Sequence, residues 1–330
     1  MAKIKDIAEQ SGFSISTISR VLNNDASLSV SDETRETIYE IADKLNYRKK
    51  MVRPRVKNIA LLYWLSDIEE LEDVYFKTMR LEVEELAKQF NVELSIYKKT
   101  GGIEQIPSTI EGFIAIGTFS NDEVEVLRSI TLKGVFIDAI EEVRGYDFVR
   151  ADLEQITIQA VDYFLEQGHR SIGFIGGTYY NPNNKRDEMD IREKAFRRYL
   201  KEKEILDENM IYQNRGFSVS NGYQLMLNAI EQLGEQLPSA FFIAADPIAV
   251  GCLQALNEKG VQIPNRVSII SVNNISVSKY VSPPLSTFHI DLKEICRNAL
   301  EMLLEQLLNK RQITKKVYIG SELIKRRSTT

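Results

Sequence analysis

The chain has 330 residues, of which 43% are hydrophobic, enough to bury a sizeable core in more than one domain. Its formal net charge of −5 argues by itself against a nucleic-acid partner, but the charge is unevenly distributed. Residues 1–57 carry 11 Lys or Arg against 8 Asp or Glu, and the remainder carries 31 against 39. We find neither a secretory signal nor an apolar membrane span of roughly 20 residues. We therefore expect a cytoplasmic protein with no membrane partner.

The chain contains only two cysteines and two histidines. The two cysteines, Cys252 and Cys296, each lie beside apolar residues on a predicted helix, which favours buried thiols over a disulfide or metal pair. No G-x-S-x-G motif or P-loop is present. Asp246 precedes Pro247, a pattern that favours a helix N-cap over a catalytic acid. We expect no catalytic site, no cofactor and no metal.

Three short helices are predicted within residues 1–47. Apolar residues recur at helical spacing over 3–11, Gly12 interrupts the pattern, and a second run continues to Val21. Gly12 can adopt the positive φ that a tight turn requires. After a polar stretch, Ser31 can cap the third helix. The first two helices around their turn form a helix-turn-helix pattern.

The second helix has one face that would meet DNA. Ile18 and Val21 point into a miniature core, and short polar groups open the helix at the end that favours a phosphate. The residues left on the outer face are Ser14, Ile15, Ser16, Thr17, Ser19 and Arg20. From spacing alone, a plain helical hairpin remains the alternative to a DNA reader.

A basic linker, residues 48–58, follows. Six of the ten residues from Arg48 to Lys57 are Lys or Arg, and no acidic residue separates them. Pro54 and the low apolar content predict a linker. Such a run suits a polyanion.

From Ile59 onward, short apolar runs alternate with longer amphipathic ones, which is typical of α/β domains. The predicted strands are Ile59–Tyr63, Val92–Tyr97, Gly112–Ile116, Val135–Asp138, Ser171–Ile175, Ala240–Ala244 and Val267–Val272. The predicted helices are Val74–Phe90, Leu153–Gln167, Asp187–Lys203, Gly222–Leu233, Pro247–Lys259 and Leu292–Leu308. Strands followed by helices imply parallel sheets with helices on both faces. Because the strands exceed one sheet of about six, we expect two lobes with a ligand cleft between them.

A long segment of the sequence carries a resemblance to a known family. The segment IKDIAEQSGFSISTISRVLNNDASLSVSDETRETIYEIADKLNY resembles the N-terminal domain of the lactose repressor and galactose repressor family. The resemblance continues through LEQGHRSIGFIGG, DIREKAF, AADPIAVGCLQALNEKG, IPNRVSIISVNN, PPLSTFHID and ELIKRRS. RGFSVSNGY, SVNN and PPLST are most similar to the branch that contains repressors of galactose and β-galactosidase operons.

The resemblance implies a fold and a division into domains. The fold is a helix-turn-helix headpiece joined to a two-lobed α/β periplasmic-binding-protein-like domain, with parallel sheets and helices on both faces. The headpiece takes 1–47, the basic linker or hinge 48–58, and the effector-binding and dimerisation domain 59–330. Within that domain, lobe 1 takes about 59–152 and 288–318, and lobe 2 takes about 153–287 and 319–330.

The resemblance also assigns DNA contacts. It implies that Ile15 and Ser16 read bases, that Thr17 and Ser19 touch phosphates, and that Arg20 reaches base or backbone. Ile15 cannot hydrogen-bond, so we expect an apolar contact with a thymine methyl group. The remaining implied contact is Asn23, where the helix ends near the DNA backbone.

The linker departs from the family pattern. Relatives carry a hinge helix whose Leu wedges into the minor groove. This chain has RKKMVRPRVKN instead, which lacks that Leu and contains a Pro that disfavours a helix interior. We expect the basic residues to hold phosphates or to lie in the minor groove as an extended arm. The residues assigned to DNA here are Arg48, Lys49, Lys50 and Arg53.

Several residues have the chemistry of a sugar site, which combines bidentate donors or carboxylates with an aromatic platform. The resemblance implies that Arg192 is the cleft arginine and that Phe217 stacks on the sugar. A surface ion pair of Arg192 with Glu188 or Asp190 is the alternative. The other candidates are Asp138 at a strand end, Trp64, Tyr75 and Phe76 as walls that could equally be core, and Asn273, where many relatives carry Asp.

These features together predict a repressor of a galactose or galactoside utilisation operon. It would bind palindromic double-stranded operator DNA as a homodimer and leave it when a small sugar enters the cleft. The resemblance implicates the helices Val74–Phe90 and Pro247–Lys259 in dimerisation. Two alternatives stay open, an architectural DNA-binding protein with an empty cleft and a sugar-transforming enzyme with a DNA-binding module.

Overall fold

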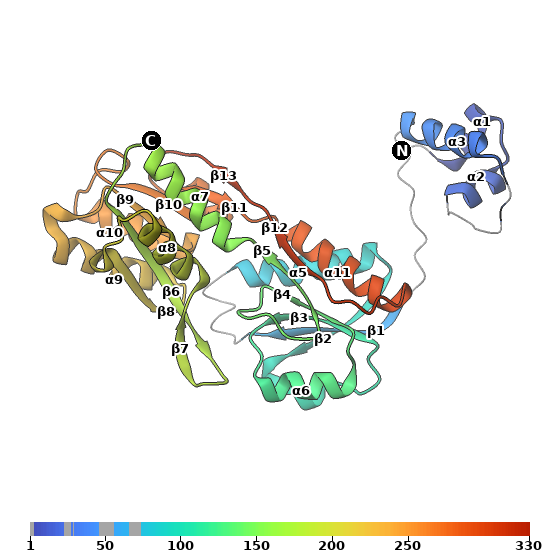
Figure 1. Cartoon of the computed structure of the whole chain (residues 1–330), viewed down its shortest axis with the longest axis horizontal. Helices are drawn as coiled ribbons and strands as arrows, with labels where there is room; N and C mark the ends of the chain where they lie inside the picture. Colours follow the sequence, from blue (N-terminus) through green and yellow to red (C-terminus); the bar gives the residue numbers. More distant parts are fainter. Residues whose placement is uncertain (1–2, 23–27, 29, 46–55, 66–73) are drawn as a thin grey trace. The chain divides into compact units, whose positions relative to one another are not determined.

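The computed structural model describes residues 3–22, 28, 30–45, 56–65 and 74–330 (Figure 1). The chain divides into two compact units, Met1–Pro54 and Arg55–Thr330. The division falls within the predicted linker, most of which lies outside the described residues.

The small unit is a three-helix headpiece. Its helices are α1 (Ile4–Ser11), α2 (Ile15–Leu22) and α3 (Asp32–Lys44). Their shared core consists of Ile7, Ile18, Val21, Ile38 and Ala42. Ile18 and Val21 are fully buried, which confirms that they point inward. The side chain of Ser31 accepts a hydrogen bond from the backbone N–H of Thr34 at 3.2 Å and so caps α3 as predicted.

Lobe 1 of the large unit is built on a six-stranded sheet with the order β12-β5-β4-β3-β1-β2. All its neighbouring strands are parallel, as predicted. The strands are β1 (Val56–Trp64), β2 (Val92–Lys98), β3 (Gly112–Gly117), β4 (Gly134–Ile137), β5 (Asp147–Ala151) and β12 (Lys316–Ile319). The helices that cover them are α5 (Val74–Gln89), α6 (Asn121–Ile130) and α11 (Leu292–Leu308).

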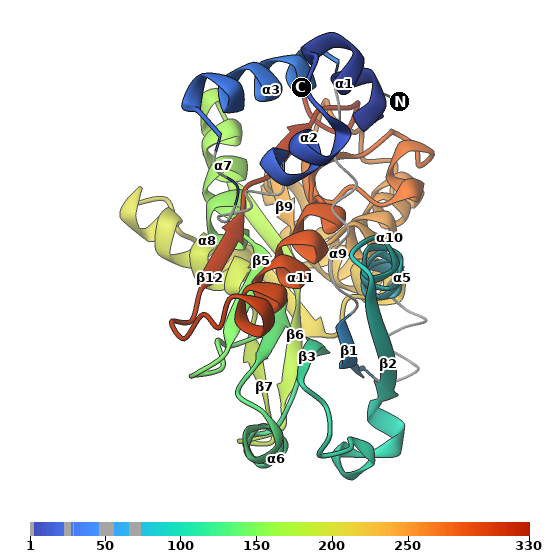
Figure 2. The same cartoon turned by 90° about the vertical axis from the view of Figure 1, so that its right-hand side faces the viewer.

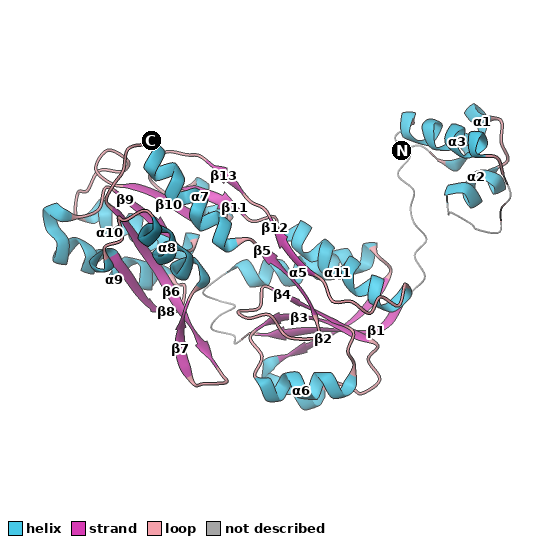
Figure 3. Cartoon of the chain, viewed as in Figure 1, coloured by secondary structure: helices cyan, strands magenta, loops and turns pink. Residues whose placement is uncertain are grey.

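Alternation along β1 shows why both faces of this sheet are covered. Ile59, Leu61 and Tyr63 join the core that includes α5 and α11, whereas Leu62 and Trp64 join the core that includes α6. Because successive side chains of a strand point to opposite faces, both faces of β1 are apolar and both need helices. Figure 3 shows the helices on the two sides of the strands.

Lobe 2 contains a seven-stranded sheet in which β13, β11, β10, β9, β6 and β7 follow in that order and β8 pairs with β6. The strands are β6 (Ile172–Asn181), β7 (Arg186–Met189), β8 (Ile211–Arg215), β9 (Ala240–Ile243), β10 (Ser268–Asn273), β11 (Ser286–His289) and β13 (Glu322–Ile324). Its helices are α7 (Leu153–Glu166), α8 (Ile191–Glu202), α9 (Val219–Leu233) and α10 (Asp246–Glu258). Strands β7 and β13 pair antiparallel to their neighbours, so this sheet is mixed.

The chain passes between the lobes after β5, after β11 and after β12 (Figure 1). Strand β11 pairs with β10 to its end at His289, slightly beyond the expected lobe division at 287. Strand β12 pairs with β5 through Ile319. The segments that join the lobes are therefore short, and each follows the end of a strand.

The region predicted as one helix, Asp187–Lys203, is two elements. Strand β7 occupies Arg186–Met189, and α8 begins at Ile191. Asp190 separates them because its carboxylate accepts a hydrogen bond from the backbone N–H of Arg192 and caps α8. The charged sequence of β7 lacks the apolar alternation that would have indicated a strand.

The prediction that Asp246 is a helix N-cap is wrong. Ala245 occupies the N-cap position of α10, and Asp246 is the first helical residue. The Asp246 carboxylate instead accepts hydrogen bonds from the Thr287 hydroxyl at 2.7 Å and from the backbone N–H of Ile275 at 2.8 Å. These bonds tie α10 to β11 and to the turn after β10. Burial raises the pKa of Asp246 to about 6, although these hydrogen bonds act in the opposite direction.

Candidate functional site

The turn before α2 has the geometry expected of a helix-turn-helix. Gly12 has a φ of +73° and donates its backbone N–H to the carbonyl of Ala8 at 3.0 Å. Ser14 then caps α2, since its hydroxyl oxygen accepts the backbone N–H of Thr17 at 3.0 Å. The two side-chain hydroxyls also lie 2.9 Å apart. These contacts fix where α2 begins.

The exposed face of α2 is the one predicted to meet DNA. Ile15 is 53% exposed, and Ser14 and Ser16 are also exposed, whereas Thr17, Ser19 and Arg20 are half-buried. An isoleucine so exposed gains little from the headpiece core. The other residues predicted to contact DNA lie outside the described residues, namely Asn23, Arg48, Lys49, Lys50 and Arg53.

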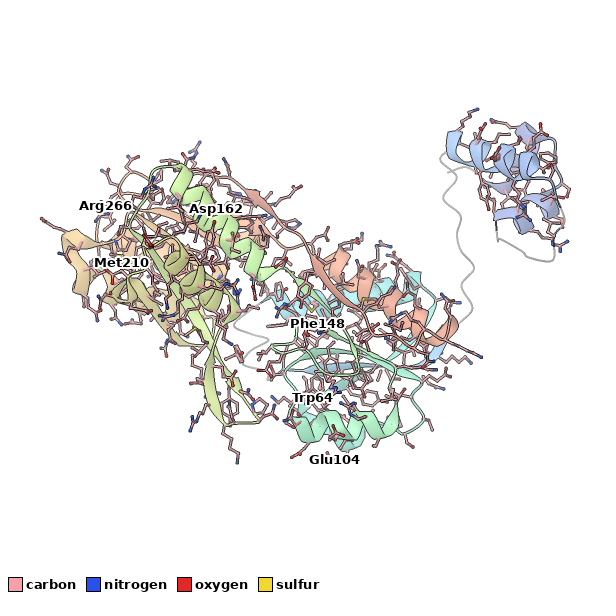
Figure 4. All side chains as sticks on the ribbon, in the orientation of Figure 1. Trp64, Glu104, Phe148, Asp162, Met210 and Arg266 are labelled. Atoms are coloured by element: carbon pink, nitrogen blue, oxygen red, sulfur yellow. The ribbon has the colours of Figure 1, made fainter. Side chains whose placement is uncertain are left out.

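The large unit contains a cavity of about 810 Å³ lined by both lobes. Lobe 1 contributes residues from the ends of β1, β3, β4 and β5, and lobe 2 contributes residues from β6, β8 and α8. Figure 4 labels Trp64, which lines the cavity from lobe 1. The predicted site residues among its lining are Trp64, Phe76, Asp138, Arg192 and Phe217.

Arg192 is held in a fixed orientation at the start of α8. Its Nε and Nη2 donate to the two carboxylate oxygens of Asp190 at 2.7 and 2.9 Å, and its Nη1 donates to the carbonyl of Ala244 at 2.7 Å. The Arg192 and Asp190 side chains are only 11% and 9% exposed. Arg192 thus does form an ion pair with Asp190, one of the two partners considered for a surface pair. The pair is buried beside the cavity and does not lie on the surface.

Arg192 is charged at the cavity and lies beside an aromatic ring. Burial lowers the pKa of Arg192, but the charges of Asp190 and Asp138 and the hydrogen bonds to Asp190 outweigh it, so the net shift is upward. The guanidinium carbon lies 5.1 Å from the centroid of the Phe217 ring. A permanently charged planar fork therefore lies against an aromatic face.

Asp138 approaches the same cavity from lobe 1. It follows β4 with a φ of +51° and donates its backbone N–H to the Val149 carbonyl at 2.9 Å. Burial raises the pKa of Asp138, while the positive charges of Arg150 and Arg192 act in the opposite direction. The Tyr75 side chain hydrogen-bonds to Asp138. Tyr75 is buried and is not among the lining residues.

Ring contacts and one hydrogen bond hold the aromatic walls in place. The indole Nε1 of Trp64 donates to Oε1 of Glu123 at 2.8 Å, and the ring stacks on Phe119 with centroids 5.0 Å apart. Phe76 lies edge-on to Tyr75, with centroids 5.2 Å apart. Trp64 is both a cavity wall and a member of the lobe 1 core.

Like Tyr75, Asn273 is a predicted site residue that does not line the cavity. Asn273 ends β10 with a φ of +111°, lies opposite His289 in the register of β11, and is not among the residues that line the cavity.

Sequence reasoning missed Arg150, which lines the cavity from β5. Its guanidinium carbon lies 5.3 Å from the centroid of Phe148 and 5.5 Å from that of Tyr318. The sequence DFVRA gave a weak strand signal, because two of its five residues are charged. The other missed lining residues of note are Tyr179, Tyr180 and Pro182 from the β6–β7 hairpin and Asp190 before α8.

The described His, Cys, Asp and Glu form no group that could hold a metal ion. Cys252 and Cys296 are buried free thiols, as predicted. No helix in the described part of the chain is long and apolar enough to cross a membrane.

Comparisons with known proteins agree with this architecture. Residues 3–50 match the family of bacterial regulatory proteins called the lacI family, and residues 161–329 match a periplasmic binding protein-like domain. The chain is 66% identical to the HTH-type transcriptional regulator GanR of Bacillus subtilis (strain 168), with 99% of each chain covered. It is 34% identical to the HTH-type transcriptional regulator GalR of Lacticaseibacillus casei, with all of both chains covered.

Solved structures share the fold. The lac repressor dimer bound to operator and an anti-inducer aligns with a TM-score of 0.69 at 20% identity, covering 99% of both chains. The complex of the transcriptional regulator CelR with cellobiose aligns with the same TM-score at 19% identity, covering 99% of this chain and 100% of that one. The predicted fold class, a helix-turn-helix headpiece and a two-lobed periplasmic-binding-protein-like domain, is confirmed. The chain belongs to the lacI family of bacterial regulatory proteins.

Proposed function

We propose that this protein represses a galactose or galactoside utilisation operon and leaves its operator when a small sugar binds between the lobes. The observation that carries the effector assignment is the convergence of Arg192, Asp138 and Phe217 on one interlobe cavity. A guanidinium fork and a carboxylate match sugar hydroxyls, and the ring matches the apolar face of a sugar. The choice of galactosides rests on the likeness of RGFSVSNGY, SVNN and PPLST to repressors of such operons.

The proposed DNA reader is α2. Its capped N-terminus suits a phosphate, and its exposed Ile15 suits a thymine methyl group in the major groove. One short helix makes few base contacts, so two headpieces on a palindromic operator are needed for useful affinity. We add Asn23, which follows α2 in the chain, and the basic linker to the proposed DNA contacts, as the sequence indicates.

A homodimer would supply the second headpiece, and exposed apolar side chains support two contact regions. Val74 and Leu81 on α5 are each about half exposed, and Tyr280, after the turn at Ser276–Lys279, is 83% exposed. Helix α10, by contrast, is largely buried against α9 within the chain. We therefore place the dimer contact on α5 and around Tyr280, and we keep the exposed face of α10 as the further contact that the resemblance implicates.

Release from DNA would follow from closing the cleft. A sugar that touches Asp138 in lobe 1 and Arg192 in lobe 2 favours the arrangement in which both reach it. A thousandfold loss of operator affinity requires about 4 kcal/mol of coupling. That energy must come from tighter sugar binding to the released state, because equal binding to both states shifts nothing.

The chain provides its own probe for a test. Trp64 is its single tryptophan and lines the cavity, so a bound sugar is expected to change its fluorescence. Galactose, lactose and glucose would be titrated while Trp64 emission is followed, and operator binding would be measured at each concentration. One galactoside should alter both signals with the same midpoint. A response to none of these sugars in either signal would contradict the effector assignment.

A further inference from the structure

The β6–β7 hairpin, residues 172–189, extends lobe 2 towards α6 of lobe 1. Figures 1 and 2 both show its outer end directed to the region of α6. The hairpin lines the 810 Å³ cavity with Thr178, Tyr179, Tyr180 and Pro182. It is therefore a wall of the cavity as well as a projection across the cleft.

The hairpin's tip, residues 181–186, has its shape fixed from within. The Glu188 carboxylate accepts hydrogen bonds from the side-chain amides of Asn181, at 2.7 Å, and Asn184. It also accepts a hydrogen bond from the Tyr179 hydroxyl. These bonds lower the pKa of Glu188, those from Asn184 and Asn181 most. The backbone N–H of Asn183 donates to Oδ1 of Asn181 at 2.9 Å. The Asn183 side chain is thus presented on a defined turn.

That side chain reaches across the cleft. Oδ1 of Asn183 accepts the backbone N–H of Asn121 at 2.6 Å. Asn121 is the first residue of α6, where backbone N–H groups have no partner within the helix. Ser120 caps the same turn through the backbone N–H of Glu123, so Asn183 acts as a second cap supplied by the other lobe.

The turn capped in this way is connected to the cavity wall. Glu123 accepts the indole N–H of Trp64 through Oε1 and the backbone N–H of Ser120 through Oε2. A ligand that displaces Trp64 would therefore also displace the first turn of α6, to which Asn183 is hydrogen-bonded. A second cavity of about 300 Å³ is lined by Asn121, Asn183 and their neighbours, so the lobes are not densely packed around this hydrogen bond. The contact can separate without breaking an apolar seam.

We propose that Asn183 is a positioning residue for the effector: its bond to the Asn121 N–H latches lobe 2 to lobe 1 and favours the closed cleft. This inference rests on the proposed function, because it concerns the same cavity. Removing the latch lowers the population of the closed state and weakens apparent sugar affinity by the same factor. For one hydrogen bond that factor is about three- to tenfold.

The first position of α6 allows the donor to be deleted with little other change. Proline is favoured at the first helical position and lacks the N–H, and Ser120 already has the extended backbone that precedes a proline. N121P therefore removes the donor, N183A removes the acceptor, and N121A keeps the donor as the matched control. The double variant N121P/N183A should be no weaker than either single one, because both remove the same bond.

Two measurements on the full chain separate the latch from the proposed function. Calorimetric titration with galactose or lactose should show about three- to tenfold weaker affinity for N121P and N183A and wild-type affinity for N121A. In the sugar-free proteins, hydrogen–deuterium exchange should become faster in the first turn of α6 in N183A and in the hairpin tip in N121P.

Each outcome decides a point. Unchanged exchange in both variants, or faster exchange with unchanged sugar affinity, overturns the latch. Faster exchange in a protein that binds neither sugar overturns the proposed effector while the contact across the cleft stands. Equal thermal midpoints of N121A and N121P would show that the proline has not damaged α6.

Discussion

The headpiece and the cleft place their functional residues in opposite ways. In the headpiece, the proposed reader is one face of α2, a run of eight residues whose inward and outward positions follow from helical periodicity. In the cleft, Asp138, Arg150 and Arg192 come from three separate elements and meet only after two lobes have folded. In a local site, one side chain can be replaced with little effect on the others. In a site assembled from distant elements, buried charged side chains stabilise one another, so replacing one affects the rest.

The largest expected effect follows from removing Arg192. R192A leaves the buried Asp190 carboxylate without its partner, which costs about 3–5 kcal/mol of stability in the large unit. Sugar affinity should fall by about a hundredfold or more, because a charged hydrogen-bonding group is lost. R192K keeps the charge but lacks the planar fork, so its sugar affinity should lie between those of the wild type and R192A. The measurement is Trp64 fluorescence titration beside sugar-free operator binding, which the headpiece should retain. Near-wild-type sugar affinity of R192A would contradict the site.

The second effect concerns pH and the cluster around Asp246. Its pKa is about 6 in the folded protein against an ordinary 3.8, so the folded state binds this proton more tightly. The resulting stabilisation is complete below about pH 4 and is lost as pH rises through 6, a loss of about 3 kcal/mol for a pKa difference of about 2.2.

D246N removes this titration. Urea unfolding of both proteins between pH 4 and pH 7.5 should show the wild type losing about 3 kcal/mol relative to the variant. The pH dependence belongs to the large unit, so headpiece unfolding followed separately should not share it. A difference between the two proteins that stays constant with pH would show that Asp246 does not titrate in this range.

A smaller effect distinguishes α2 from its neighbour α3. Ser14 and Ser31 cap their helices in the same way, each accepting the backbone N–H of a Thr three residues later. S14A and S31A should each cost about 1 kcal/mol of headpiece stability. Only S14A should weaken operator binding beyond that loss, because α2 is the proposed reader. Equal loss of DNA affinity in the two variants, measured by gel shift, would argue against this role of α2.

The smallest effect is expected at Ile15. Since its side chain is 53% exposed, I15A should change headpiece stability by less than about 0.5 kcal/mol. It should nevertheless relax preference for one thymine in each half-site, at a cost of about 1 kcal/mol. Competition between operator variants that differ at single positions would reveal this. Uniform weakening at every position would indicate a backbone contact instead.

The sequence predicted the strongly periodic elements and the residues next to them. Helical spacing indicates that Ile18 and Val21 belong to the headpiece core, and the apolar run of β1 is evident in the sequence because both faces of that strand are buried. Strands β7, β8 and β12 carry exposed or half-exposed residues, and none has an apolar run longer than three residues to mark it. They form because neighbouring strands offer a paired edge, which is a tertiary effect.

The residues of the cleft are also only partly predictable from the sequence. The family likeness pointed to Arg192, but its bond to the Ala244 carbonyl spans 52 residues and has no local signature. Arg150 was missed together with β5, and Asn273 was included although it is not among the cavity-lining residues. Such contacts depend on where strand ends meet, which spacing along the chain does not specify.

The most direct test of the central claim is selection of random duplex DNA by the purified protein at near-physiological salt, with and without galactose, lactose and related galactosides. The bound DNA would be sequenced after each selection. We expect one palindromic motif that is enriched without sugar and lost with one galactoside. Failure to enrich any motif would contradict a sequence-specific repressor, and a motif indifferent to every sugar would contradict the effector assignment.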